Sequence, residues 1–164
     1  LYAVIQNMAV TEQYGFSMVT VNVVMMGFVA FIWFWSAWKG NTVFSFDNIT
    51  WKTGWTIPVA LFCLWWPMDL RTALPDFRLH YLLDSGAVLG FCSMTPVFLT
   101  LLILSKRSVS RVVLRVTAMV GVIIGCYNMG NFATDTGFYL GLYHLPLLGI
   151  SLFALLSSKR KKNE

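Results

Sequence analysis

Two carboxylates and an imidazole recur at intervals of four residues near the middle of the chain. They are Asp76, His80 and Asp84. Pro75 directly before them suits the first turn of a helix, where Asp76 also complements the helix dipole. Residues four apart share one face of a helix. The spacing therefore predicts a carboxylate–imidazole–carboxylate face, with Arg78 pointing elsewhere.

This polar face has three interpretations. The simplest is an interfacial polar surface on which His80 is held by its neighbours. The second is a ligand-binding or proton-handling site, because the histidine side chain titrates near neutral pH. The third is a metal site, which needs further ligands from elsewhere in the chain. Asp135, in a later connection, is a further candidate, and we expect it to form an ion pair with Arg71 or Arg78.

His144 is the second of only two histidines in the sequence. It lies seven residues into an apolar run, on the order of 10 Å along a helix. The simplest interpretation is a buried neutral side chain bonded to a neighbouring helix. Together with His80 it offers the two axial ligands of a bis-histidine haem, but the expected depths of the two histidines differ. We therefore expect no cofactor, with haem or a metal ion as the alternative.

Motifs of known catalytic chemistry are absent from the sequence. It contains no GxSxG, HExxH, CxxC or phosphate-binding glycine loop. Cys63, Cys92 and Cys126 each lie in an apolar run, where cysteine behaves as a small apolar side chain. The sequence favours a protein that is not an enzyme. The alternative is a membrane-embedded enzyme or redox protein that uses the Asp and His candidates.

The composition indicates what kind of fold must position these residues. Of 164 residues, 57% are hydrophobic and 12% are charged, and the mean hydropathy is +0.68. Soluble domains are roughly 45–50% apolar and about 25% charged. A domain of this size leaves much of its surface in water, so this composition favours a chain embedded in lipid.

Five apolar runs are candidates for spanning helices, which need about 20 residues each. They cover residues 17–38, 54–70, 82–105, 112–131 and 137–156. The runs are continuous, whereas barrel strands alternate apolar and polar residues. We expect an all-α integral membrane protein, with residues 1–164 forming a single bundle of about five transmembrane helices. Pro58 and Pro67 predict a kink or a tilted entry in the second run.

The basic residues divide unevenly between the two sides of that bundle. One side carries ten, namely Lys39, Lys52, Lys106, Arg107, Arg111, Arg115, Lys159, Arg160, Lys161 and Lys162, and the other carries Arg71 and Arg78. Because cytoplasmic loops are enriched in Lys and Arg, we expect the N-terminus outside and a basic cytoplasmic tail at 157–164. We expect the cell (inner) membrane as the location and no nucleic-acid partner.

Three GxxxG pairs and many aromatic residues suggest how the helices pack. The pairs are Gly86 with Gly90, Gly121 with Gly125, and Gly137 with Gly141. Such pairs let helix backbones approach closely in membranes, which predicts that the last three helices form a tight core. Tryptophans and tyrosines near the ends of the runs are typical of interfacial belts. An aromatic ligand cage on Trp65 and Trp66 is the alternative.

These patterns favour a non-enzymatic membrane component. We expect a subunit of a membrane complex, or a small carrier or channel that works as an oligomer. Its partners would be the lipid bilayer and either other membrane subunits or further copies of itself. A membrane sensor or lipid-binding protein is a further alternative, since a basic tail attracts anionic lipid.

Overall fold

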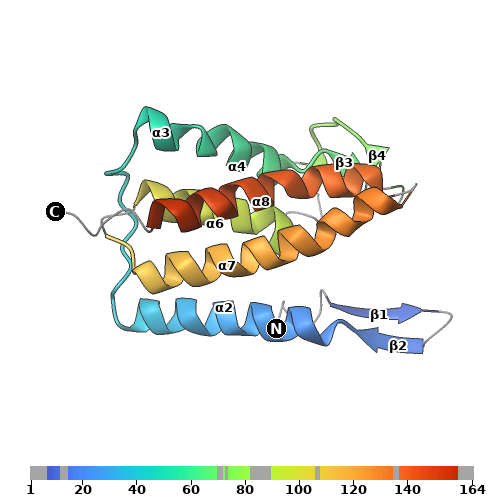
Figure 1. Ribbon diagram of the computed structural model, residues 1–164, viewed down its shortest axis with the longest axis horizontal. Coiled ribbons are helices and arrows are strands. Elements are labelled where there is room, and N and C mark those ends of the chain that lie inside the picture. The colour runs from blue at the N-terminus through green and yellow to red at the C-terminus, as the bar shows by residue number, and fades with distance from the viewer. Residues whose placement is uncertain are drawn as a thin grey trace.

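The computed structural model describes residues 7–11, 15–69, 72, 74–81, 90–105, 108–134 and 137–158. The structure is mostly helical. Its elements are β1 (Met8–Thr11), β2 (Gly15–Met18), α2 (Thr20–Trp38), α3 (Trp51–Gly54), α4 (Thr56–Trp65), β3 (Met68–Asp69), β4 (Leu74–Pro75), α6 (Phe91–Leu104), α7 (Arg111–Asn128), the 3₁₀ helix η2 (Met129–Ala133) and α8 (Phe138–Ser158). The helices lie side by side, with their axes roughly along one direction (Figure 1).

Three of the described helical stretches are long and apolar enough to cross a membrane. They are Thr20–Trp38, Arg111–Ala133 and Phe138–Ser158, each with a mean hydropathy of 1.7. α6 has 14 residues, about 21 Å of helix, and the expected span at 82–105 begins with residues 82–89, outside the described part. By length and composition, the described residues contain three candidate spans, against the five expected.

The second expected span, 54–70, is interrupted. α3 ends at Gly54, α4 covers only Thr56–Trp65, and the chain then turns at Trp66. Pro67 disfavours the helical conformation in the residue before it, and Trp66 takes the left-handed conformation with φ 45° and ψ 66°. Pro58 lies in the first turn of α4, where a missing backbone N–H costs no intrahelical bond.

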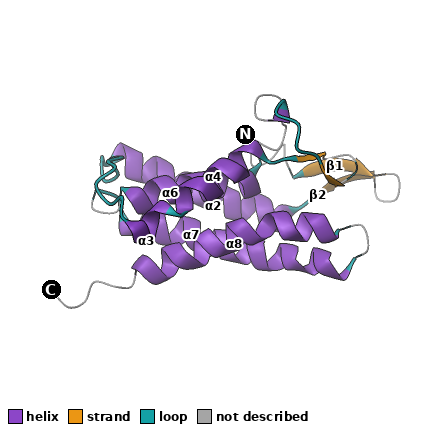
Figure 2. Cartoon of the chain, turned by 90° about the horizontal axis from the view of Figure 1, so that it is seen from above, coloured by secondary structure: helices purple, strands orange, loops and turns teal. Residues whose placement is uncertain are grey.

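A small hairpin precedes α2. β1 and β2 pair antiparallel with Met8 opposite Met18. The first span was expected to begin at residue 17, but the hairpin takes up residues to Met18 and α2 begins at Thr20. Gly15 at the start of β2 has a φ of +64°, a conformation that glycine adopts readily. Seen from above, the hairpin extends past the helices at the end opposite the C-terminus (Figure 2).

The core lies where α6, α7 and α8 meet. Apolar side chains there are almost wholly shielded, with relative exposures between 0% and 3%: Leu99, Leu102, Ile103, Val113, Leu114, Ala118, Ile150 and Ala154. α4 packs on α6, and α2 lies against α7 at one side of the bundle. Trp33 of α2 donates a 2.9 Å hydrogen bond from Nε1 to Oγ1 of Thr117 in α7.

α7 and α8 approach each other closely at two glycines. A Cβ added to Gly121 would lie 2.3 Å from Ser151 Oγ, and one added to Gly125 would lie 3.1 Å from Leu148 Cβ. These two positions therefore use the missing side chain to bring the helices together. The other expected pairs are placed differently. Gly137 and Gly141 face η2, while Gly90 is the N-cap of α6 and Gly86 lies outside the described residues.

The loop at 39–50 closes one end of the bundle by capping α6. The backbone N–H of Asn48 donates to the carbonyl of Leu104 at 2.9 Å, and its side-chain amide donates to the carbonyl of Ile103, also at 2.9 Å. The backbone N–H of Ser45 donates to Ser105 Oγ. The last carbonyls of a helix have no intrahelical partner, and this loop supplies the donors.

Candidate functional site at the weakly charged end

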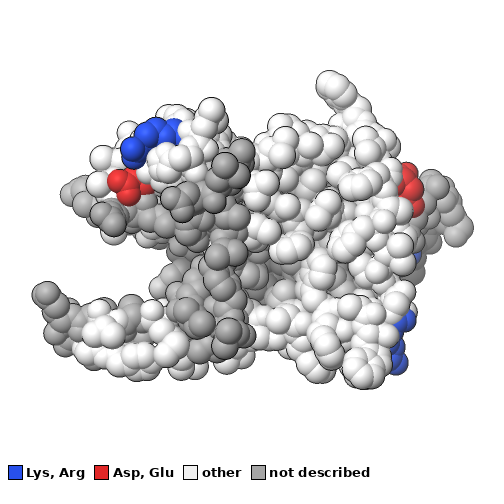
Figure 3. Space-filling model, turned by 180° about the vertical axis from the view of Figure 1, so that it is seen from behind, with Lys and Arg blue, Asp and Glu red and all other residues white. Residues whose placement is uncertain are grey.

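The described charged side chains lie at the two ends of the molecule, and none of them lies in its middle. One end, called here the basic end, carries Lys39, Lys52, Arg111 and Arg115, with Asp47 in the loop that caps α6. The other end, called here the weakly charged end, carries Asp69, Asp76 and Arg78. Figure 3 shows blue and red atoms together at each end of this face, with an uncharged band of white residues between the two ends among the residues described. Of the residues that suggested chemistry, Asp76 and His80 therefore lie toward the weakly charged end, whereas His144 is buried within α8.

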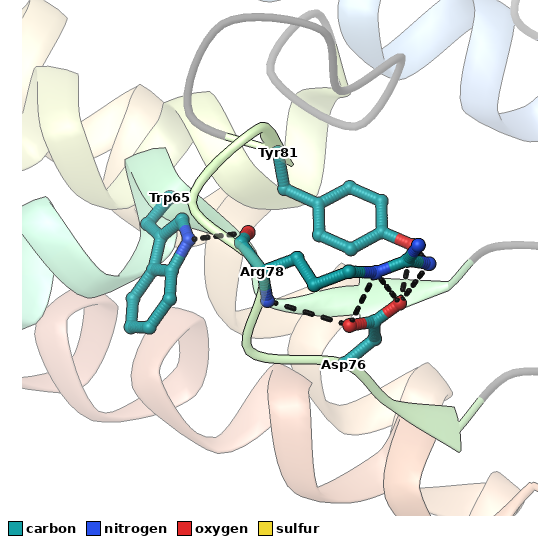
Figure 4. Close-up of polar contacts among 4 residues, drawn as sticks. All are labelled: Trp65, Asp76, Arg78 and Tyr81. Carbon is teal, nitrogen blue, oxygen red and sulfur yellow. Dashed lines mark hydrogen bonds and ion pairs between the residues drawn. The ribbon is translucent and has the colours of Figure 1, made fainter.

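Asp76 and Arg78 form an ion pair just after β4 (Figure 4). Arg78 Nε donates to both oxygens of the Asp76 carboxylate, at 2.9 and 2.8 Å, and its Nη2 contacts Oδ2. The hydroxyl of Tyr81 donates to the same Oδ2 at 2.9 Å. Hydrogen bonding to Arg78 is the main reason that the pKa of Asp76 falls to about 2. Asp76 is therefore an ionised hydrogen-bond acceptor, a poor general base.

The expected helical face on Asp76, His80 and Asp84 is wrong in its first half. Residues 76–80 are not helical, so Asp76 and His80 do not share a helix face, and Arg78 binds Asp76 instead of pointing away. The physical reason is local. The Asp76 side chain accepts from the backbone N–H of Arg78 at 3.3 Å, an Asx turn that competes with helix formation.

The other candidates at this end are separate from that ion pair or outside the described residues. His80 is exposed, and its ring lies 4.1 Å, between centroids, from the ring of Tyr81. Asp84 and Asp135 both lie outside the described residues, as does Arg71. Within the described ranges, no group of three or more His, Cys, Asp or Glu side chains is placed to hold a metal ion.

Trp66 has an unusual backbone conformation, since it is the one non-glycine residue in the described ranges with a positive φ. Its backbone is left-handed, which is uncommon for a bulky residue, and its side chain is only 4% exposed. The indole packs against Tyr143 at 5.4 Å and edge-on against His144 at 5.9 Å, between ring centroids. Its Nε1–H has no hydrogen-bond partner among the described atoms. Trp66 is thus a buried side chain, and the expected belt or ligand cage does not describe it.

His144 is buried, at 4% exposure, but it does not bond to a neighbouring helix as expected. Its Nδ1 lies 2.7 Å from the carbonyl oxygen of Leu140 in the same helix. A carbonyl can only accept, so Nδ1 carries the proton, and in a neutral ring Nε2 is left as an acceptor. The buried site therefore holds an indole donor and an imidazole acceptor in one apolar cluster.

One carbonyl joins the Trp66 cluster to the Asp76 turn. The oxygen of Pro67 accepts the Tyr143 hydroxyl at 2.6 Å and the backbone N–H of Asp76 at 2.9 Å. Trp65 Nε1 also donates to the carbonyl of Arg78 at 3.3 Å. These bonds fasten the connection after α4 to α8 and to α4 itself. Their arrangement fits structural fastening better than catalysis, because the polar groups of Tyr143, Pro67 and Trp65 are engaged in bonds between separate parts of the chain.

An apolar groove separates α4 from α8 beside this cluster. Its volume is about 670 Å³, and Phe62, Phe77, Tyr143 and Pro146 are among its lining residues. The lining is dominated by apolar and aromatic side chains. The groove therefore offers contact area to an apolar chain and few groups that could direct a reaction.

Comparison with protein-family models, with curated proteins and with solved structures finds no match for this chain. The function must accordingly be inferred from the residues themselves. Sequence reasoning missed the importance of Trp66, although a Trp–Pro pair within an apolar run is a signal that a helix ends there.

Proposed function

We propose that this chain is a non-enzymatic integral membrane protein of the cell (inner) membrane that serves as a subunit of a membrane complex. The observation that supports the proposal is the uncharged band between two charged ends. Large apolar side chains stand exposed along that band on α2, including Phe28, Phe31 and Trp35 at 49%, 59% and 52%. Contiguous apolar surface of this kind marks a membrane or a protein interaction site.

The basic end lies in the cytoplasm under this proposal. Lys39, Lys52, Arg111 and Arg115 stand at that end, against Arg78 at the other, among the described residues. α8 also runs toward the basic end (Figure 1), and the Lys/Arg-rich tail follows it directly in the sequence. The positive-inside rule then sets the orientation.

The outer face of α2 supports a partner helix. Its exposed apolar residues alternate at spacings of three and four: Val21, Val24, Phe28, Phe31, Trp35 and Trp38. This is the spacing of a seam between two helices. α2 is also the least covered of the three candidate spans, with 17% of its apolar window buried against 44% and 39% for the others. A second helix on this face would cover α2 as α7 covers the opposite face.

A solute path through a single copy has less support. Where α6, α7 and α8 meet, apolar side chains such as Leu99, Ile150 and Ala154 are 0% exposed. Closely packed apolar side chains leave no room for a hydrated path. A carrier or channel function would therefore need several copies around a shared axis, and it remains an outcome of the same experiment.

The test is gentle purification of the tagged full chain in digitonin, followed by native electrophoresis and mass spectrometry of the chains that accompany it. The key variant is Phe31→Ala with Trp35→Ala, whose rings stack at 6.3 Å between centroids. The control is Leu61→Ala, an equally exposed apolar residue on α4. We expect a partner or a second copy to be lost only in the α2 variant. A wild-type chain that runs alone, or an α2 variant that keeps its partner, contradicts the proposal.

A further inference from the structure

A small groove opens between α7 and α8 at the basic end. Its volume is about 310 Å³, and the described residues that line it are Arg115, Val116, Met119, Leu155 and Ser158. Three of these five side chains are apolar, and one is a permanent cation. The groove thus combines an apolar floor with a positive charge.

Arg115 is held in place by the end of α8. Its Nε donates to Ser158 Oγ at 3.2 Å, and its Nη2 donates to the Ser158 carbonyl at 3.3 Å. A cation beside the last carbonyls of a helix is favourable. Only two of the five guanidinium N–H groups are engaged by these bonds, so the others remain available to a ligand.

Arg115 lacks an acidic partner within the described ranges, where the ion pair is that of Arg78 with Asp76 at the opposite end. Arg111 lies one turn before Arg115 on α7. In the sequence, Lys159, Arg160, Lys161 and Lys162 follow Ser158 directly, and Glu164 comes two residues after Lys162. Asp47, in the loop that caps α6, is the described carboxylate at this end. Among the described residues at this end, four cations, Lys39, Lys52, Arg111 and Arg115, stand against the one carboxylate of Asp47.

We propose that this groove binds one anionic phospholipid, with the lipid phosphate on Arg115 and an acyl chain along Val116, Met119 and Leu155. The inference rests on the proposed membrane location, which puts Arg115 at the cytoplasmic boundary of the hydrocarbon. Phosphate is the anion available at that level, and guanidinium binds it through two parallel hydrogen bonds. Basic pockets between membrane helices on the cytoplasmic side are suited to anionic headgroups.

The experiment measures lipid binding by native mass spectrometry of the full chain in a neutral detergent. Phosphatidylglycerol is the probe, and phosphatidylcholine and inorganic phosphate are the comparison arms. The wild-type chain should retain phosphatidylglycerol in preference to phosphatidylcholine. Arg115→Gln should weaken that binding about fivefold, the effect of losing one cation near a lipid surface. Arg115→Lys, which keeps the charge, should recover part of the loss.

Two control variants distinguish lipid binding in the groove from attraction to the other positive residues at this end. Lys52→Gln removes a positive charge at the same end but outside the groove, and it should leave lipid binding unchanged. Replacing Lys159, Arg160, Lys161 and Lys162 by Gln tests the tail. The inference is overturned if Arg115→Gln binds as the wild type does, if the tail variant alone loses the lipid, or if inorganic phosphate displaces it. An unchanged melting curve of Arg115→Gln without added lipid shows that the variant is folded.

Failure of the membrane proposal itself gives a different result. If alkaline carbonate releases the wild-type chain from membranes without detergent, the proposed location is wrong whatever the lipid assay shows. If the chain stays in the membrane and shows no preference for phosphatidylglycerol, only the lipid site is wrong.

Discussion

The hydroxyl of Tyr143 donates a 2.6 Å hydrogen bond to the carbonyl oxygen of Pro67, a residue 76 positions away in the sequence. This bond fastens the turn that ends α4 to the second turn of α8. The same carbonyl accepts the backbone N–H of Asp76, so one oxygen joins three segments. The Trp66–Pro67 turn is therefore a structural junction of the weakly charged end.

Tyr143→Phe tests this junction, because it removes the hydroxyl and leaves the ring stacked on Phe62 and packed at a tilt against Trp66. A hydrogen bond contributes about 1 kcal/mol net, so we expect the free energy of unfolding to fall by about that amount. The measurement is unfolding in mixed detergent micelles with increasing dodecyl sulfate. Tyr139→Phe, one turn earlier on α8 and exposed, is the control. Equal effects of the two variants would show that the Pro67 bond contributes nothing.

The α7–α8 contact at Gly121 is tested by adding a methyl group. In Gly121→Ala the new Cβ would lie 2.3 Å from Ser151 Oγ, and overpacking of this kind costs about 1–3 kcal/mol. Ser151 Oγ is buried without a described partner, so Ser151→Ala alone should change stability little. The double variant should regain much of the loss. Gly149→Ala, with nothing within 4 Å of the added Cβ, is the control, and a loss there as large as at Gly121 would reject close helix contact as the cause.

Because Asn48 caps α6, we expect Asn48→Ala to lower the free energy of unfolding. The side-chain bond to the Ile103 carbonyl is lost while the backbone bond to Leu104 remains. We expect a loss of about 1 kcal/mol in the free energy of unfolding. Asn41→Ala in the same loop keeps its backbone bond to Ser36 and should have a smaller effect. The same unfolding titration compares them, and indistinguishable variants would show that the loop does not cap α6.

The lowered pKa of Asp76 predicts that the folded protein loses stability in acid. Its folded-state pKa, about 2, lies below the ordinary value of 3.8. For a carboxyl with a lowered pKa, stability is present above the unfolded value and is lost as the pH falls toward the folded value. The melting temperature of the wild type should therefore fall between about pH 4 and pH 2 relative to that of Asp76→Asn. Parallel pH profiles for the two proteins would contradict the ion pair.

The sequence predicted the mainly helical structure because continuous apolar runs near 20 residues have few other solutions. It located the long helices well, as α8 at Phe138–Ser158 lies close to the expected 137–156. It overestimated the length of the helix in the run that contains α4, because hydropathy does not take into account that Trp66 precedes a proline. Apolar content alone gave no warning of a left-handed turn inside the run.

The candidate site was harder to predict for a related reason. The four-residue spacing of Asp76 and His80 assumed a helix, whereas the short Asp side chain binds the backbone N–H of Arg78 and forms a turn. The burial of Trp66 against His144 depends on contacts between residues 78 positions apart, which one sequence cannot reveal. Close approach at Gly121 and Gly125 was anticipated, since the GxxxG spacing has a direct geometric meaning.

The most direct test of the account is site-specific cysteine labelling in intact cells with a membrane-impermeant maleimide, in a chain whose Cys63, Cys92 and Cys126 are replaced by Ala. Thr134→Cys reports the weakly charged end, Asn41→Cys the basic end, and Leu145→Cys the exposed middle of α8. We predict labelling of position 134 in intact cells, of position 41 only after the membrane is opened, and of position 145 in neither case. Labelling of position 145 by the aqueous reagent, or labelling of position 41 from outside, would contradict the central claim that the uncharged band lies in hydrocarbon with the basic end in the cytoplasm.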